Sequence, residues 1–315
     1  MPAFTASAPG KIILFGEHAV VYGRPAIAVP VTQVRARAVI KANPLGQPGE
    51  LHIQSKEIDL DAPLDSLSED HPLRRTVQEI LAALAVSVPP ACTLRISSTI
   101  PIASGLGSGA AVSVAVVRAL SAFLGHPLPD ERVSAIVYEI EKLYHGTPSG
   151  IDNTVITYAR PVYFIRGKPL ERIKIGAPFM IVIGDSGVPS PTATAVGDLR
   201  KAWQASPQHY ESLFEAVGHL TLVARRAIEA GRTSELGPLM DENQRLLDEM
   251  GVSSPRLEAL TSAAREAGAL GAKLSGGGRG GNMIALVQDK RSAERVSRAL
   301  ENAGAVHTIV TTVGD

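Results

Sequence analysis

The segment PIASGLGSGAAVSVAVVRALSAFLG, which begins at Pro101, constrains the fold more than any other stretch. Glycines stand at alternate positions, Gly105, Gly107 and Gly109, and good helix formers follow them directly. Glycine lets the backbone turn tightly and approach a ligand, and the free N–H groups at a helix start carry partial positive charge. The segment therefore predicts a strand end, a glycine-rich turn and a helix ending near Gly125. The turn is a candidate phosphate cradle.

Two other interpretations of this turn stay open. The string G-x-x-x-x-G-K-[ST] is absent, so the turn is not a Walker loop, but it matches the dinucleotide fingerprint G-x-G-x-x-A. An acidic residue, Asp130 or Glu131, follows at about the 20-residue distance of a Rossmann-type NAD-dependent dehydrogenase. Against this, Pro101 interrupts the strand and the loop lies far from the N-terminus. The other interpretation is a tight strand-to-helix turn that binds nothing.

Length and charge limit the classes of protein to consider. The 315 residues are enough for about two domains of roughly 150 residues. Hydrophobic residues make up 45% and charged residues 20%, which excludes a disordered, collagenous or coiled-coil chain. The 31 basic residues balance the 31 acidic ones, so a nucleic-acid binder that depends on a general basic field is not expected. An anionic ligand would have to be held by local groups.

Cysteine usage and hydropathy predict a cytoplasmic protein that does not interact with membranes. The single cysteine, Cys92, excludes an internal disulfide and a cysteine-based zinc cluster. The N-terminal residues lack the cationic start and apolar core of a secretory signal. The apolar run AAVSVAVVRALSAFLG contains Arg118 and is shorter than the roughly 18 to 20 apolar residues of a membrane span.

The pattern of elements changes near residue 175. Before it, IAVPVTQ, VRARAVIK, LHIQS and CTLRISS predict strands, with an opening hairpin or meander and a surface loop over 43–70. Helical spacing is present in 73–84 and 130–144. After it, the strand FMIVIGD precedes helices over 191–204, 207–230, 233–250 and 255–268, and the strands MIALV and HTIVTTV flank a helix over 290–303. We therefore expect two domains, 1–175 and 176–315.

Polar residues inside apolar or glycine-rich strings are the candidates for chemistry. SAPGKIILFGEHAVVYG contains Lys11, Glu17 and His18, which must either pair with one another or face a ligand, because burying an unpaired charge is costly. The lysine suits a phosphate or carboxylate partner, whereas for the histidine by itself a structural role is favoured over ligand binding. KLSGGGRGGNMIAL is either a flexible turn or a second anion-contacting loop with Arg279 as donor. Its glycines precede a strand, which is the wrong order for a Rossmann start.

Two carboxylates near the middle of the chain are further candidates. Asp152 lies in PSGIDN, where proline and glycine fix the backbone, so it either aims into a cleft and accepts a hydroxyl proton or simply caps a turn. Glu141, on the preceding predicted helix, either offers an oxygen to a hard cation such as Mg²⁺ or is a solvated surface residue.

Taken together, these strings resemble the GHMP kinase superfamily. APGKIILFGEHAVVYG, PIASGLGSGAA and KLSGGGRGGNMIAL occur in that family's order, and HGTPSGIDN lies between the last two. GEHAVVYG and HGTPSGIDN resemble the branch that phosphorylates mevalonate, in preference to those acting on homoserine, galactose or phosphomevalonate. The resemblance runs from about residue 6 to residue 290.

The resemblance implies transfer of the γ-phosphoryl group of ATP to the 5-hydroxyl of mevalonate, with Mg²⁺ as cofactor. It implies a two-domain α+β fold: an N-terminal ribosomal-S5-like domain with a left-handed β-α-β element, and a C-terminal ferredoxin-like domain with extra helices. The active site would be the cleft between them, and a homodimer is usual among relatives. A kinase for another small alcohol and a metabolite-binding relative without activity are the rivals of this hypothesis.

Individual roles are implied by position in these motifs. Asp152 matches the catalytic aspartate and Lys11 the lysine beside it, and the pair would polarise the acceptor hydroxyl. Glu17 and His18 match residues that face the acceptor, and Glu141 matches a magnesium ligand. ATP binding is implied for Pro101, Ile102, Ala103, Ser104, Gly105, Leu106, Gly107, Ser108, Gly109, Ala110 and Ala111. The loop closing beside the phosphates would be Ser275, Gly276, Gly277, Gly278, Arg279 and Gly280.

The chain departs from the family pattern in two places. The middle loop usually reads G-L-G-S-S-A, and its second serine is the usual magnesium partner, whereas here Ser108 is followed by Gly109. Ser108 or a water molecule would then take that position, since Mg²⁺ commonly keeps several waters. In the last loop, Arg279 and Asn282 stand where glycine and a small residue are common. The arginine would either add positive charge beside a phosphoryl group or point to solvent.

Overall fold

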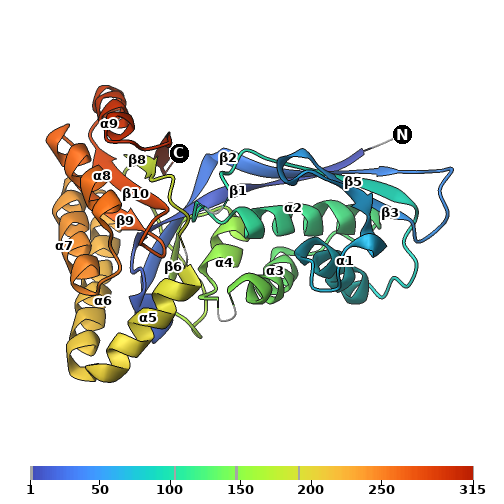
Figure 1. Cartoon of the computed structure of the whole chain (residues 1–315), viewed down its shortest axis with the longest axis horizontal. Helices are drawn as coiled ribbons and strands as arrows, with labels where there is room; N and C mark the ends of the chain where they lie inside the picture. Colours follow the sequence, from blue (N-terminus) through green and yellow to red (C-terminus); the bar gives the residue numbers. More distant parts are fainter. Residues whose placement is uncertain (1–2, 103, 146–147, 191, 315) are drawn as a thin grey trace. The chain divides into compact units, whose positions relative to one another are not determined.

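The computed structural model describes residues 3–102, 104–145, 148–190 and 192–314 (Figure 1). Helices and strands are mixed along the whole described chain, as expected for an α+β protein. The chain divides into two compact units that are not consecutive blocks. Unit 1 comprises 1–10, 34–101 and 107–159, and unit 2 comprises 11–33, 102–106 and 160–315. The expected split at residue 175 thus remains a prediction about the family's domains.

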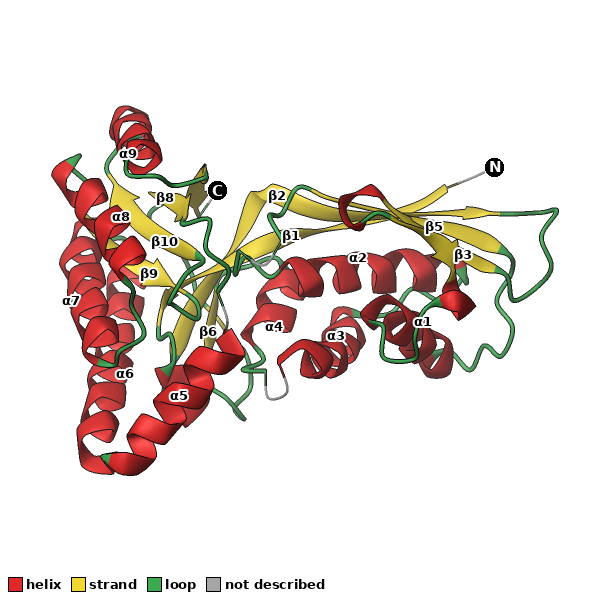
Figure 2. Cartoon of the chain, in the orientation of Figure 1, coloured by secondary structure: helices red, strands yellow, loops and turns green. Residues whose placement is uncertain are grey.

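Unit 1 consists of strands with helices packed on one side of them (Figure 2). Its strands follow the order β4-β3-β5-β2, in which β3 and β5 are parallel and the other pairs are antiparallel. β1 also pairs with β2, and both of these long strands continue into unit 2. The elements are β1 (Ala3–Phe15), β2 (Ala26–Ala42), β3 (Leu51–Ser55), β4 (Leu60–Pro63), β5 (Cys92–Ser98), α1 (Pro72–Ala83), α2 (Ser108–Phe123), α3 (Asp130–His145), α4 (Ile151–Tyr158) and the short 3-10 helices Lys56–Ile58 and Leu64–Ser66.

The centre of unit 1 is α2, which is apolar on most of its surface and packs against α1, α3 and α4. Its one charged residue, Arg118, donates to Asp130 of α3 at 2.7 Å and to the carbonyl oxygen of Thr157 at the end of α4 at 2.6 Å. A single guanidinium therefore ties three helices together, which accounts for a charge within an otherwise apolar helix.

Unit 2 contains a four-stranded sheet in the order β11-β8-β10-β9, with every neighbouring pair antiparallel. Helices α7, α8 and α9 pack on these strands, and α6 packs on α7 and on the 3-10 helix Ala19–Tyr22. The elements are β6 (Val162–Phe164), β7 (Glu171–Arg172), β8 (Phe179–Asp185), β9 (Gly271–Ser275), β10 (Asn282–Val287), β11 (His307–Val313), α5 (Thr192–Ala205), α6 (Pro207–Glu229), α7 (Leu236–Glu249), α8 (Pro255–Glu266), α9 (Lys290–Asn302) and the 3-10 helix Thr233–Glu235. None of the described helices is both long and apolar enough to cross a lipid bilayer.

The structure confirms most predicted elements and corrects one. IAVPVTQ and VRARAVIK belong to one continuous strand, β2, instead of two. Pro30 suggests a break because it has no N–H to donate. It lies between Ala26–Ala28, which pair with β6, and Ala36–Ala42, which pair with β5, so neither of these two ladders needs that N–H. The sequence also left β1, β4, β6, β7, β9 and α4 unassigned.

Candidate active site

In unit 1, the glycine-rich turn opens α2 as predicted. Gly107 is the N-cap residue, with φ 74° and ψ 34°, a left-handed conformation that favours glycine. Its lack of a side chain leaves no side-chain cap on the N–H groups of the first turn. Ser108 and Gly109 are the first two residues of the helix, and both are half-buried. The helix start therefore has the geometry of an anion site.

Asp152 is the second residue of α4, and Gly150, with φ 93°, holds the N-cap position. Asp152 is therefore not the N-cap residue of this helix. Its neighbours are held firmly, because Asn153 donates to the hydroxyl and the carbonyl of Ser134 at 2.8 and 3.2 Å, and Thr154 donates to Gly150 at 2.7 Å. The half-buried Asp152 thus lies in the first turn of a firmly held helix, where negative charge is favoured. Gly146 and Thr147 of the HGTPSGIDN string lie outside the described residues.

Glu141 of α3 is only 3% exposed, so its interpretation as a solvated surface residue is wrong. The buried carboxylate and the Ser108 hydroxyl are hard oxygen donors within unit 1, on two helices that pack together. No group of three or more acidic, histidine or cysteine ligands occurs among the described residues. This donor set suits Mg²⁺, which is commonly bound by one or two carboxylates together with substrate phosphates and water.

In unit 2, the structure brings parts of the three glycine-rich strings together. The Lys11 N–H donates to the carbonyl oxygen of Leu106 at 3.0 Å, which joins the first string to the middle one. The Asn282 amide donates to the carbonyl oxygen of Ser104 at 2.5 Å, which joins the last string to the middle one. Lys11 and Asn282 are 5% and 1% exposed, so these connections are internal. Ala103, within the same loop, lies outside the described residues.

The GEH string forms a strained turn. His18 has φ 61° and ψ −51°, and the Ala19 N–H donates to Glu17 O at 2.6 Å. These are the features of a γ-turn of the rare positive-φ form, which costs energy and needs a supporting structure. The support includes Gly16, with φ 97°, where a Cβ atom would overlap Pro25. The turn places a carboxylate and an imidazole on consecutive residues in a buried position.

Glu17 and His18 differ in their charged partners. Glu17 forms an ion pair with Lys273 of β9, and neither side chain has exposed surface. Burial raises the pKa of Glu17 and lowers the pKa of Lys273, and each partner opposes the shift of the other. Burial also lowers the pKa of His18 to about 4. His18 is therefore neutral at pH 7, and its Nε2–H donates to the carbonyl oxygen of Gly277 at 3.1 Å.

The C-terminal glycine loop is closely packed from Gly277 to Gly280, which contradicts the interpretation as a flexible turn. A Cβ at Gly277 would lie 2.6 Å from Thr192 Oγ1, and one at Gly280 would lie 2.6 Å from the Val188 carbonyl oxygen. Ser190 Oγ donates to Gly278 O at 3.2 Å. Glycines here permit close approach of neighbouring atoms rather than motion.

Arg279 has a definite partner. Its guanidinium forms an ion pair of 2.6 Å with Asp198 of α5, and the pKa of that carboxyl is lowered by the hydrogen bond from the guanidinium. The Arg279 backbone has φ 59°, and its N–H donates to Val252 O at 2.9 Å. The arginine side chain is 34% exposed, so it neither points freely to solvent nor stands as an uncompensated positive charge.

Several residues of this region were not singled out in the sequence, namely Ser190, Thr192, Asp198 and Lys273. Lys273 is the most informative of them, because a lysine inside the short apolar strand GAKLS should have signalled a buried partner. That partner, Glu17, is 256 positions away in the chain, so local pattern does not identify it.

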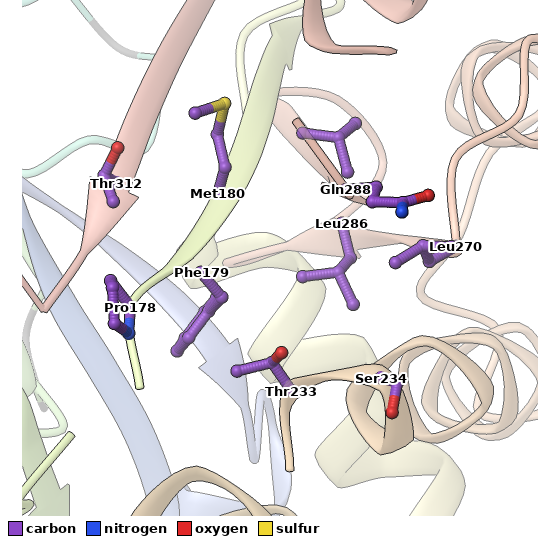
Figure 3. A pocket seen from close by; sticks show the side chains of 10 residues that line it. Pro178, Phe179, Met180, Thr233, Ser234, Leu270, Leu286, Gln288 and Thr312 are labelled. Carbon is purple, nitrogen blue, oxygen red and sulfur yellow. The ribbon is translucent and has the colours of Figure 1, made fainter. Parts of the chain in front are cut away.

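A shallow cavity of about 560 Å³ lies elsewhere in unit 2, at one end of the sheet (Figure 3). Its lining is apolar around a few uncharged polar groups: Pro178, Phe179, Met180, Thr233, Ser234, Leu270, Leu286, Val287, Gln288 and Thr312. None of these residues is ionisable, and none belongs to the strings described above. The cavity therefore lacks the groups that phosphate chemistry requires.

Comparison with known proteins accounts for the order of the strings. A family model described as GHMP kinases N terminal domain matches residues 73–160, and one described as GHMP kinases C terminal matches residues 224–306. Mevalonate kinases of Thermococcus sibiricus and Pyrococcus horikoshii are each 37% identical to the chain, covering 98% and 96% of it and 95% and 94% of their own lengths. The crystal structure of L. major mevalonate kinase in complex with R-mevalonate superposes with a TM-score of 0.85 and 31% identity, over 99% of this chain and 96% of that one. These matches overturn the Rossmann alternative for the middle loop. With both family models and relatives that span nearly its whole length, the chain belongs to the GHMP kinase family.

Proposed function

We propose that the chain transfers the γ-phosphoryl group of ATP to the 5-hydroxyl of mevalonate, giving 5-phosphomevalonate and ADP. The observation that carries the proposal is the bonding of the Lys11 and GEH region to both glycine-rich loops within unit 2. Three strings that the sequence associates with one reaction are there joined by specific hydrogen bonds. The curated relatives named as mevalonate kinases support mevalonate as the acceptor.

Phosphoryl transfer needs positioning and charge neutralisation more than covalent catalysis. The start of α2 at Ser108 and Gly109 offers uncapped N–H groups to the triphosphate oxygens. Lys11 adds positive charge as a point donor. Mg²⁺, held by Glu141 and Ser108, would neutralise further charge on those oxygens. Each group stabilises charge that spreads over the transferring phosphoryl group.

Asp152 is assigned to the acceptor hydroxyl. Its carboxylate, on the second residue of α4, accepts a hydrogen bond from the 5-hydroxyl and takes its proton as the oxygen attacks phosphorus. Glu17 and His18 are assigned to binding the remainder of the acceptor, because a buried carboxylate and a neutral imidazole suit hydroxyl groups. The GHMP kinase fold accepts different alcohols, so the specificity for mevalonate is assigned to the residues that bind the acceptor.

ADP release with Mg-ATP, measured across mevalonate, phosphomevalonate, homoserine and galactose, tests the proposal directly. We expect turnover with mevalonate and little with the other three. Turnover with another of the alcohols instead would identify a GHMP kinase with a different acceptor. Tight ATP binding without acceptor-dependent ADP release would identify a relative that has lost activity.

The role of Asp152 is tested by Asp152→Asn. A lost proton acceptor should lower kcat about 1,000-fold and leave the KM for ATP nearly unchanged. Asp130→Asn is the matched control, because Asp130 also lies in the first turn of a helix in unit 1 but pairs with Arg118. Near-normal turnover of Asp152→Asn would remove the aspartate from its assigned role.

Two broader expectations stay predictions. The composition favours a cytoplasmic protein, and the family resemblance implies a homodimer. Sedimentation equilibrium of the purified chain tests the second, and a monomer at micromolar concentration would contradict it.

A further inference from the structure

Strand β9 is anchored along both of its edges. On one edge it pairs with β10. On the other, Asp241 accepts from Ala272 N at 3.0 Å, Gln244 accepts from Leu274 N at 2.7 Å, and Arg265 donates to Ala272 O at 2.6 Å. An edge strand whose outward N–H and C=O groups are satisfied by side chains is fixed in register. β9 is therefore a firm support for whatever its side chains touch.

β9 and the residues after it bond to the segment from Ile13 to His18 at three positions, Lys273, Ser275 and Gly277. Alternate residues of a strand share a face, and Lys273 and Ser275 both bond to this segment. Lys273 Nζ donates to Glu17, and Ser275 Oγ donates to Ile13 O at 2.8 Å and accepts from Ile13 N at 3.2 Å. Two residues further on, Gly277 O receives the hydrogen bond from His18 Nε2 at 3.1 Å.

These contacts leave a buried acceptor on each of two consecutive residues. Glu17 Oε2 and His18 Nδ1 have no hydrogen-bond partner among the described residues. Buried acceptors without donors are costly, so such a pair indicates a place where a ligand's donor groups bind. A polyhydroxylated or hydroxy-acid acceptor carries donors of this kind.

Lys273 also governs the charge of this pair. Burial favours the neutral carboxyl of Glu17, while the ammonium of Lys273, and more weakly that of Lys11, favours the carboxylate. His18 is faced by the charges of Arg279 and Lys273, which add to its burial in keeping it neutral. Loss of Lys273 would therefore raise the pKa of Glu17 and convert an acceptor group into a donor.

We propose that Lys273 is a positioning residue for the alcohol substrate: it holds Glu17 so that Glu17 and His18 present their unpartnered hydrogen-bond acceptor atoms to hydroxyl groups of that substrate. The inference rests on the proposed function for the identity of that alcohol. Lys273 itself touches neither ATP nor the acceptor in this scheme and acts only through Glu17.

The test compares Lys273→Met with Arg265→Met. Both changes remove a cation bonded to β9, but only the first affects Glu17. We expect Lys273→Met to raise the KM for mevalonate about 10- to 100-fold, the effect of losing one hydrogen bond involving a charged group, with little change in the KM for ATP. In this variant kcat/KM for mevalonate should rise with pH as Glu17 ionises. Arg265→Met should leave both KM values within about threefold, because Asp241 and Gln244 still bond to the outer edge of β9. Equal effects of the two changes, or a Lys273→Met enzyme without the pH-dependent step, would overturn the inference.

If Lys273→Met alone does not fold, a second pair of variants tests the proposal. The variants Glu17→Gln and Glu17→Gln/Lys273→Met should have the same KM for mevalonate, because Lys273 has no carboxylate left to position. A further increase in the double variant would show that Lys273 acts independently of Glu17 and would contradict the proposal.

Infrared difference spectroscopy separates this inference from the proposed function. The carbonyl-stretching band of a protonated carboxyl, assigned by its loss on Glu17→Gln, should appear at neutral pH in Lys273→Met and not in the unaltered chain. If the unaltered chain releases no ADP with mevalonate, the proposed function fails, and this band still decides whether Lys273 controls Glu17. Absence of the band in Lys273→Met would refute that control.

Discussion

The two glycine-rich loops use glycine for opposite reasons. At Gly105, which precedes α2, φ is +88° but the nearest atom to an added Cβ, Asn282 Nδ2, is 3.8 Å away. In the C-terminal loop, an added Cβ at Gly278 would overlap the Val252 carbonyl oxygen, and one at Gly277 would lie 2.6 Å from Thr192 Oγ1. Gly105 is needed for its backbone torsion, whereas Gly277 and Gly278 of the second loop leave no room for a side chain.

This difference explains how the candidate site can combine an open loop before α2 with a rigid C-terminal loop. A loop with free space around it can admit a triphosphate to its N–H groups. The C-terminal loop is closely packed from Gly277 to Gly280, and there it is held by the His18 imidazole, Ser190 and the α5 residue Asp198. Substitutions should therefore damage binding in the first loop and stability in the second.

The largest effect on stability should come from Gly278→Ala. The new methyl would meet a backbone oxygen that is itself held by the Arg279 N–H, and φ is +70°. Overpacking combined with left-handed strain should lower the free energy of unfolding by about 3 kcal/mol. Urea denaturation would show this as a lower midpoint at unchanged slope.

Gly276→Ala is the matched control for that prediction. Its φ is +89°, but nothing lies within 4 Å of an added Cβ, so it tests strain without overlap. A loss of about 1 kcal/mol is expected. Equal losses at the two positions would mean that the C-terminal loop is not limited by space.

Acid should weaken the C-terminal loop through His18. The unfolded imidazole binds a proton at the ordinary pKa of 6.5, whereas the folded one does so at about 4, because it is buried. The unfolded state thus holds more protons between these values, and stability falls as the pH decreases from 6.5 to 4. The loss should approach about 3 kcal/mol.

His18→Asn isolates this contribution, since asparagine tolerates a positive φ better than most residues and does not titrate. Chemical denaturation at pH 7 and pH 4.5 should show a smaller acid loss in the variant than in the unaltered chain. Identical losses would mean that His18 is not the group responsible.

The first loop should show the converse behaviour in Gly105→Ala. Left-handed strain alone should lower the free energy of unfolding by about 1 kcal/mol. The KM for ATP should nevertheless rise about tenfold, because a small shift of the N–H groups weakens a charge-assisted hydrogen bond to phosphate. A Gly105→Ala enzyme with normal KM for ATP but greatly reduced stability would reverse the comparison between the loops.

Much of the fold was predictable because long helices carry a strong periodic signal. The predicted helix over 207–230 corresponds to α6 at Pro207–Glu229, and the predicted strand FMIVIGD is β8. α4 was not assigned because Ile151–Tyr158 is short and rich in β-branched residues, which favour strands. Its helical form depends on burial against α2 and α3, which local sequence does not report.

The sequence predicts which residues belong to the candidate site, but not which of them bond to one another. Glycines, Lys11 and Asp152 are visible as unusual residues in ordered strings. The bonds that join Ser104 to Asn282, or Glu17 to Lys273, link residues 178 and 256 positions apart. Such pairings are set by tertiary packing, so the role of a residue such as Lys273 can be inferred only once its partner is known.

The smallest effect should come from Arg279→Gly. The ion pair with Asp198 joins side chains that are 34% and 41% exposed, and such exposed pairs contribute little once solvent and salt screen them. Glycine would also relieve the positive φ of 59° at this position. We therefore expect a change in Tm of less than about 2 °C, measured by calorimetry at low and high salt. A large loss of stability at both salt concentrations would show that the arginine is needed to hold the loop on α5. In that case close packing of glycine would not by itself explain the rigidity of the C-terminal loop.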